Sequence, residues 1–261
     1  MKKRILENVF VWLVFLFLFL PIIILIIYSF NSSSMNITFQ SFTFDWYKNL
    51  FNNTDLMESF LNTLLVAVVS TFISTILGTM AAYGLYKYDF PLKGLINSLI
   101  YIPIVIPEIV LGISLLSVYT LMKLELSLFT IILSHIAFSV PFVIVSVRSN
   151  LSKETKTYEE AAKDLGASNF KIFKEIVLPV IMPAVISGAT LAFTLSLDDV
   201  VISYFTAGPG SNTLPLYIYS MIKTGITPDV NALSSIMVLI VFTILISLTI
   251  VQGRKIRKRV L

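Results

Sequence analysis

Long apolar runs separated by short polar segments dominate the chain, and six of them are long enough to cross a lipid bilayer. The runs cover roughly residues 9–29, 60–86, 95–121, 127–147, 180–203 and 231–251. A helix of about 20 apolar residues spans the hydrocarbon core. These runs are too long and too continuously apolar for the strands of a barrel. The pattern therefore predicts an all-α polytopic membrane protein with six transmembrane helices.

The composition agrees with this class. Of 261 residues, 56% are hydrophobic and 13% are charged, whereas soluble domains carry about a quarter charged residues. The chain has no cysteine, which excludes disulfides and thiolate metal sites. A basic start, Met1 to Arg4, precedes the first apolar run. Because that run is too long for a signal peptide and no small-residue cleavage site follows it, we expect an uncleaved signal anchor.

The distribution of basic residues predicts the orientation. With six spans, sixteen of the nineteen Lys and Arg residues fall on the side that holds both termini, including the basic tail 253–261. Basic residues favour the cytoplasmic side, so both termini are expected there. The net charge of +4 then reflects topology rather than nucleic-acid binding.

Local features add detail to the spans. Pro103 and Pro107 should bend or open the third span. In the outer loop 30–58, aromatic residues indicate a short segment lying in the membrane interface, although a loosely packed loop fits equally well. His135, the only histidine, is expected to make a structural hydrogen bond between helices; a proton relay is the less favoured alternative because no titratable partner is evident nearby.

Residues 152–179 form a polar segment between the fourth and fifth spans. Thr157 and Glu160 have the spacing of a capping box, which predicts a helix start. An apolar stripe would follow at helical spacing, made of Tyr158, Ala161, Ala162 and Leu165. The remaining face would carry Glu159, Lys163 and Asp164.

The same segment should turn and continue as a second short helix. Gly166 can adopt the left-handed conformation that ends a helix, and Ser168 can cap the next one. Phe170, Phe173 and Ile176 would share a face of that helix, and Leu178-Pro179 would end it before the fifth span.

Helices this short need support from other structure. A helix lying on lipid favours bulky apolar residues and a basic polar face. The first helix instead has small Ala161 and Ala162 with three acids. A protein partner therefore fits the segment better than a lipid surface.

Three acidic residues fall inside apolar runs, where a charge costs about 2.5–3.5 kcal/mol. Glu108 follows Pro107, and Asp198 and Asp199 are adjacent. A rise of about 1.5 Å per helical residue places them in the outer half of the membrane. They indicate a water-accessible path that favours cations. Alternatively, Glu108 caps a broken helix and the two aspartates mark the end of the fifth span. A Ca²⁺ site is not expected, because such a site needs six or more oxygen ligands.

The polar segment resembles the cytoplasmic "EAA" loop of ABC-importer permeases. The family pattern falls on Glu160-Ala161-Ala162, Gly166, Ile176 and Leu178-Pro179 without a gap. The stretch 197–233 and the Pro103–Val110 run are similar to PotC-type permeases of spermidine/putrescine importers. The resemblance covers essentially the whole chain and implies a MetI-like type I importer fold.

The resemblance also implies an assembly. It pairs the chain with a PotB-like permease, two PotA-like ATPases that bind ATP and Mg²⁺, and a PotD-like extracytoplasmic binding protein. The site residues that it implies for ATPase coupling are Tyr158, Glu160, Ala161, Ala162, Leu165, Gly166, Ile176, Leu178 and Pro179. We call residues 152–179 the coupling segment. This chain has no phosphate-binding loop of the Gly-x-x-x-x-Gly-Lys-Ser/Thr type, so no enzymatic activity or cofactor is expected of it.

The expected organisation is an N-terminal helix with its outer loop (1–58), a permease core of five spans (59–252) and the basic tail (253–261). The expected function is import of polyamines into the cytoplasm across the bacterial inner membrane. Alternatives are a permease for another small solute, a gradient-driven secondary transporter, and a scaffold that transports nothing. Secondary transporters often show matching halves, which are not visible here.

Overall fold

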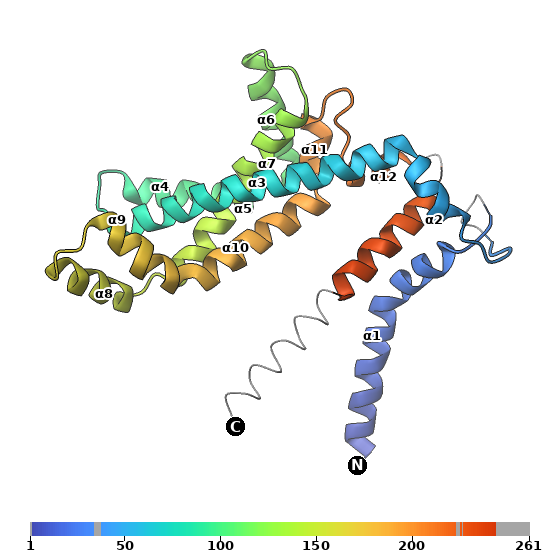
Figure 1. Cartoon of the computed structure of the whole chain (residues 1–261), viewed down its shortest axis with the longest axis horizontal. Helices are drawn as coiled ribbons and strands as arrows, with labels where there is room; N and C mark the ends of the chain where they lie inside the picture. Colours follow the sequence, from blue (N-terminus) through green and yellow to red (C-terminus); the bar gives the residue numbers. More distant parts are fainter. Residues whose placement is uncertain (1, 34–37, 223–224, 226, 244–261) are drawn as a thin grey trace. The chain divides into compact units, whose positions relative to one another are not determined.

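The computed structural model describes residues 2–33, 38–222, 225 and 227–243, which are predominantly helical (Figure 1). Within these ranges the only strand-like pairing is one isolated bridge between Asn31 and Phe42. The chain divides into two compact units, Met1–Met57 with Ser220–Leu261 and Glu58–Tyr219. Each unit is described separately.

The first unit contains the N-terminal helix and a packed loop. Its elements are α1 (Lys2–Tyr28), α2 (Asp45–Asn49), the 3-10 turn η1 (Leu50–Asn52) and the helix Pro228–Thr243. The side chains from Val9 to Leu20 are largely exposed in α1. A helix that is apolar on all sides and uncovered by protein suits a lipid environment.

Aromatic packing organises the loop after α1. The Phe30 ring stacks on Phe42 with centroids 5.0 Å apart and lies 5.1 Å from Tyr47. Trp46 Nε1 donates to the carbonyl oxygen of Asn31 at 2.6 Å, and Asn31 is fully buried. The loop is therefore packed rather than loose, and its placement in the membrane interface stays a prediction.

The second unit carries most of the spans. Its elements are α3 (Thr54–Lys87), α4 (Lys93–Ile100), α5 (Ile102–Val105), α6 (Glu108–Leu121), α7 (Leu128–Arg148), α8 (Lys153–Asp164), α9 (Asn169–Ile172), the π-helical turn η2 (Phe173–Val177), α10 (Leu178–Asp198), α11 (Val201–Thr206) and α12 (Leu214–Ser220).

Small residues bring α3, α7 and α10 together (Figure 1). A Cβ atom added to Gly78 of α3 would lie 2.6 Å from Val143 Cβ of α7, and one added to Gly188 of α10 would lie 3.2 Å from Val143 Cα. Close approach at small residues is how helices associate in lipid, where no hydrophobic force drives them together. The core around this contact includes Ala82, Val147 and Ile181.

Most predicted spans have a helical counterpart. Within the described ranges, four helical stretches are long and apolar enough to cross a membrane: Glu7–Tyr28, Thr54–Lys87, Leu128–Arg148 and Asn169–Asp198. A fifth span would be formed by the pair Lys93–Val105 and Glu108–Leu121, which is bent by 110° at the break between them. The bend expected from the prolines of the third span is confirmed. Of the sixth span, 231–251, the structure describes residues up to Thr243, and the tail 253–261 lies outside the described residues.

The fifth span differs from its prediction as one helix over 180–203. α10 ends at Asp198, Asp199 adopts an extended conformation, and α11 begins at Val201. The apolar pattern continues through this break, so hydrophobicity alone did not show it. The Asp199 side chain, described below, begins the second helix.

Candidate functional site

The first helix of the coupling segment, α8, begins earlier than its sequence pattern predicted. α8 starts at Lys153 with Ser152 as its N-cap, and Ser152 and Thr155 form the capping box. The Thr155 N–H donates to Ser152 Oγ, and the Ser152 N–H donates to Thr155 Oγ1, both at 3.4 Å. The predicted box of Thr157 and Glu160 is wrong, because both residues lie inside the helix. The earlier start adds one turn to α8.

The turn after α8 confirms two predictions. Gly166 has φ +81°. Its N–H donates to the Lys163 carbonyl at 2.9 Å, and the Ala167 N–H donates to the Ala162 carbonyl at 3.0 Å, which is the Schellman pattern of a helix end. Ser168 then caps α9 by accepting from the Lys171 N–H. The chain thus reverses sharply at a residue that tolerates the left-handed conformation.

The predicted helix end at Leu178-Pro179 is wrong. α9, η2 and α10 follow one another as a single helical stretch, Asn169–Asp198. A proline is tolerated in the first turn of a helix, and the wider π-helical turn just before it leaves room for the ring. The coupling segment is therefore joined to the span α10 by an unbroken helix.

The exposed and buried faces of α8 only partly match the predicted stripe. Thr155, Glu159 and Ala162 form the buried face, with Glu159 8% exposed and ion-paired with Lys87 at 3.2 Å. Tyr158 is 52% exposed and Leu165 is 89% exposed. The predicted placement of Glu159 on the outer face is wrong, because the end of α3 offers it a partner.

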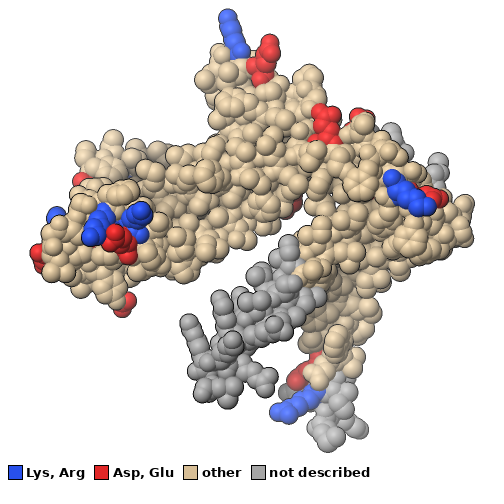
Figure 2. Space-filling model, viewed as in Figure 1, with Lys and Arg blue, Asp and Glu red and all other residues tan. Residues whose placement is uncertain are grey.

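An exposed apolar stripe on α8 and an adjacent open hollow account for most of the remaining predicted residues. Tyr158, Ala161 and Leu165 leave an apolar stripe uncovered, with the exposed Glu160 beside it. A hollow of about 520 Å³ lies in the angle between α8 and α9 and is lined by residues of both helices, including Leu165, Gly166 and Ile176. Charged side chains gather at this end of the second unit (Figure 2). The uncovered apolar stripe is thus surrounded by charged side chains, a pattern typical of protein interaction sites.

The acids in the apolar runs have very different surroundings. Asp199 is 8% exposed and caps α11: it accepts from the N–H groups of Ile202 at 3.0 Å and Ser203 at 2.8 Å, and from Ser203 Oγ at 2.7 Å. His135 Nε2 lies 3.3 Å from the same carboxylate. Asp199 is therefore a buried acid whose carboxylate is fully engaged by neighbouring groups.

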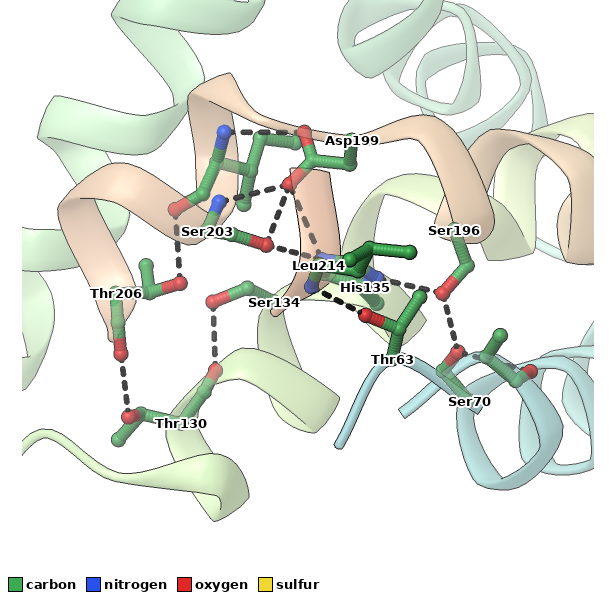
Figure 3. A network of polar contacts seen from close by, with 12 residues as sticks. Thr63, Ser70, Thr130, Ser134, His135, Ser196, Asp199, Ser203, Thr206 and Leu214 are labelled. Atoms are coloured by element: carbon green, nitrogen blue, oxygen red, sulfur yellow. Dashed lines mark hydrogen bonds and ion pairs between the residues drawn. The ribbon is translucent and has the colours of Figure 1, made fainter. Parts of the chain in front are cut away.

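These contacts belong to a wider buried polar network (Figure 3). His135 Nδ1 lies 2.7 Å from Ser196 Oγ of α10, and that oxygen lies 3.2 Å from Ser70 Oγ of α3. Thr130 Oγ1 of α7 donates to the Thr206 carbonyl of α11 at 2.8 Å. His135 thus connects α7 with α10 and α11, as expected of a structural histidine. The sequence did not reveal Asp199 as its partner because the two residues are 64 positions apart.

Asp198 and Glu108 remain accessible. Asp198 is the last residue of α10 and Glu108 the first of α6, and both side chains are exposed. α6 packs against α11, and a Cβ added to Gly112 would lie 2.7 Å from the Phe205 ring. The two exposed acids thus sit at the broken ends of their spans, where helical hydrogen bonding stops.

Residues 74–260 match the protein family described as the binding-protein-dependent transport system inner membrane component. The chain belongs to this family. It is 42% identical over 252 residues to the spermidine/putrescine transport system permease protein PotC of Escherichia coli. The matched region covers 97% of this chain and 96% of that protein. The chain is 37% identical over 215 residues to the putrescine transport system permease protein PotI of the same species, covering 80% and 76%.

Solved structures of importers contain chains with a similar fold. A bacterial ABC transporter involved in the import of the acidic polysaccharide alginate contains a chain that superposes with a TM-score of 0.73 at 18% identity, covering 97% of this chain and 96% of that one. The predicted resemblance to PotC-type permeases and the predicted importer-permease fold are confirmed. The protein is accordingly a multi-pass membrane permease subunit.

Proposed function

We propose that this chain is the membrane subunit of an ATP-driven importer that carries polyamines into the cytoplasm. It would pair with a PotB-like permease, be driven by two PotA-like ATPases that bind ATP and Mg²⁺, and receive substrate from a PotD-like binding protein. Both termini and the coupling segment would face the cytoplasm, which the distribution of basic residues supports. The family and the relatives named above support this assembly.

The observation that carries this proposal is the uncovered apolar stripe of α8. Leu165 is 89% exposed at the tip of a helix whose opposite face is buried in the core. Ala162, Ile172 and Val177 anchor the segment in that core. An anchored segment with an outward apolar stripe can transmit force from a docked partner to the spans. The unbroken helix from α9 into α10 provides a direct path for this force.

The substrate class rests on the relatives and on charge. Both relatives named above are permeases of spermidine or putrescine transport systems. The likeness to the alginate transporter supports the fold and not the substrate. Glu108 and Asp198 are exposed carboxylates near the breaks in their spans. A polycation would interact favourably with such groups, so we assign them to the substrate path. Asp199 serves that path by holding the turn directly after Asp198.

Docking can be tested with the Leu165→Asp variant in the assembled complex. A carboxylate at this exposed end of the stripe would have to be desolvated on docking, so we expect the ATPase to be lost on co-purification. Leu92→Asp is the matched control, because Leu92 is 69% exposed in the neighbouring turn and has φ 67°, which aspartate tolerates. Retention of the ATPase by Leu165→Asp would contradict the docking model.

Transport itself is tested in reconstituted vesicles. The complete complex should take up spermidine or putrescine only with ATP, and a neutral solute should not compete. Uptake by the purified chain alone at the full rate would show a gradient-driven carrier instead. ATP-driven uptake of the neutral solute would identify a permease for a different substrate.

A further inference from the structure

A charged cluster at the end of α3 holds the buried face of α8. Lys87 Nζ lies 3.2 Å from Glu159 Oε2. Tyr83 Oη donates to the same oxygen at 3.1 Å, and Lys87 Nζ donates to Tyr83 Oη at 2.6 Å. Each of the three side chains thus contacts the other two. We call Tyr83, Lys87 and Glu159 the α3–α8 clamp.

The clamp is largely removed from water. The side chains of Lys87 and Glu159 are 19% and 11% exposed. Glu159 Oε1 is buried and accepts no hydrogen bond from the described part of the chain. The charge of Glu159 therefore depends on Lys87 for compensation. Removal of one partner from such a pair leaves a poorly solvated charge, which is more disruptive than removal of both.

The clamp links α8 to α3, a span to which the chain does not connect it directly. The chain joins α8 to α7 through residues 149–152 and to α10 through the helical stretch that begins at α9. No such connection joins α8 to α3, which ends 66 positions before α8 begins. Side-chain contacts alone make this link. Tyr86 Oη adds a bond to the Ser152 carbonyl at 3.2 Å, and the Tyr83 ring lies 4.9 Å from Phe173.

The adjacent Glu160 cannot make this link. Its carboxylate lies 3.9 Å from Lys156 of the same helix, and both side chains are about two-thirds exposed at 66% and 70%. An exposed pair one turn apart on a single helix contributes little to stability and connects no second element. The two neighbouring glutamates thus face different directions, Glu160 outward and Glu159 toward α3.

We propose that Lys87, Tyr83 and Glu159 are positioning residues that make α3 move together with the coupling segment. The inference rests on the proposed function, since it assigns the segment's motion to an ATPase. Movement of α8 then reaches α7 and α10 through the chain, and α3 through the clamp and through the buried core that Ala82 and Leu85 share with Ala162. Without the clamp, the ATPase still docks and hydrolyses ATP, but α3 follows α8 less closely.

The test compares Glu159→Gln with the native protein in the assembled, reconstituted complex. Three quantities are measured: ATPase retained on co-purification, ATP hydrolysed, and solute taken up. We expect retention and hydrolysis to persist while solute uptake per ATP falls about tenfold, a typical size for coupling between sites. Lys93→Gln is the matched control. Lys93 pairs with the exposed Asp89 at 2.8 Å in the turn after α3, where its hydrogen bond and charge lower the pKa of Asp89. This pair lies outside the clamp. Uptake per ATP in Lys93→Gln should be unchanged.

Two double variants complete the design. Lys87→Met/Glu159→Gln removes both charges, so it should fold better than Lys87→Met alone and still be uncoupled. Lys87→Glu/Glu159→Lys reverses the pair and should regain part of the lost uptake per ATP. Native uptake per ATP in Glu159→Gln, or in the uncharged double variant, overturns the clamp proposal. Failure of the proposed function is seen separately, in the native chain, as transport without the ATPase.

Discussion

The coupling segment and the buried polar network around His135 lie in one unit and use their polar side chains in opposite ways. In the network, the Asp199 carboxylate accepts three hydrogen bonds and also contacts His135. In the coupling segment, Glu160 and the apolar Leu165 face outward, and one buried oxygen of Glu159 has no partner in the described chain.

We infer from this difference that the buried network stabilises the fold, whereas the coupling segment serves contact with a partner. A polar group buried in a protein or a membrane is costly unless it is fully hydrogen-bonded, so a satisfied network favours a single arrangement. An exposed apolar stripe is incomplete until another surface covers it. Four further experiments can test this contrast, in addition to the docking and clamp experiments above.

The largest effect is expected for Asp199→Ala. The change leaves two backbone N–H groups and the Ser203 hydroxyl without their acceptor, at about 1–3 kcal/mol for each unsatisfied group. We expect a loss of about 3 kcal/mol in the free energy of unfolding, measured by denaturation in detergent, and loss of uptake. Asp198→Ala is the control and should change stability by less than about 0.5 kcal/mol. Equal effects of the two substitutions would show that the network is not structural.

The next effect concerns the turn of the coupling segment. Gly166 has φ +81°, and an added Cβ would meet no atom within 4 Å, so any effect there is conformational. The left-handed conformation costs other residues about 1–2 kcal/mol, and β-branched residues more. Gly166→Val should therefore lower uptake about tenfold, whereas Gly166→Asn should stay near the native rate. The assay is ATP-driven uptake, and identical rates for both variants would remove the turn from the mechanism.

A smaller effect is expected for the exposed acids. Asp198→Asn and Glu108→Gln each remove one charge from water-accessible surroundings, where an ion pair at 4 Å is worth about 1 kcal/mol. Spermidine uptake should fall about fivefold in each variant without a change in complex assembly. Glu154→Gln, which removes an exposed charge from α8, is the control. Unchanged kinetics in both variants would exclude these residues from the substrate path.

The smallest effect is expected for Lys156→Gln. It removes the exposed pair with Glu160, and such pairs contribute up to about 1 kcal/mol and often nothing measurable. Stability and uptake per ATP should remain close to native in the reconstituted complex. A loss as large as that of Glu159→Gln would mean that charge anywhere on α8 matters, and would weaken the assignment of the clamp.

Local features of the sequence were sufficient for a large part of this description. Apolar runs predicted the spans because a bilayer demands continuous hydrophobicity whatever the partners of a helix are. Gly166 and Ser168 were correctly assigned because helix ends depend on a few adjacent residues. The proline-rich stretch around Pro107 correctly predicted a bend, for the same local reason.

Long-range contacts decided the rest. Glu159 turns inward because Lys87 lies opposite, and Asp199 breaks the fifth span because it caps α11 beside His135. Each outcome depends on residues that become neighbours only after folding. A sequence specifies how hydrophobic a segment is and where its backbone can turn, but the partner of a buried charge is chosen by packing, since only the folded chain brings opposite charges within hydrogen-bonding distance.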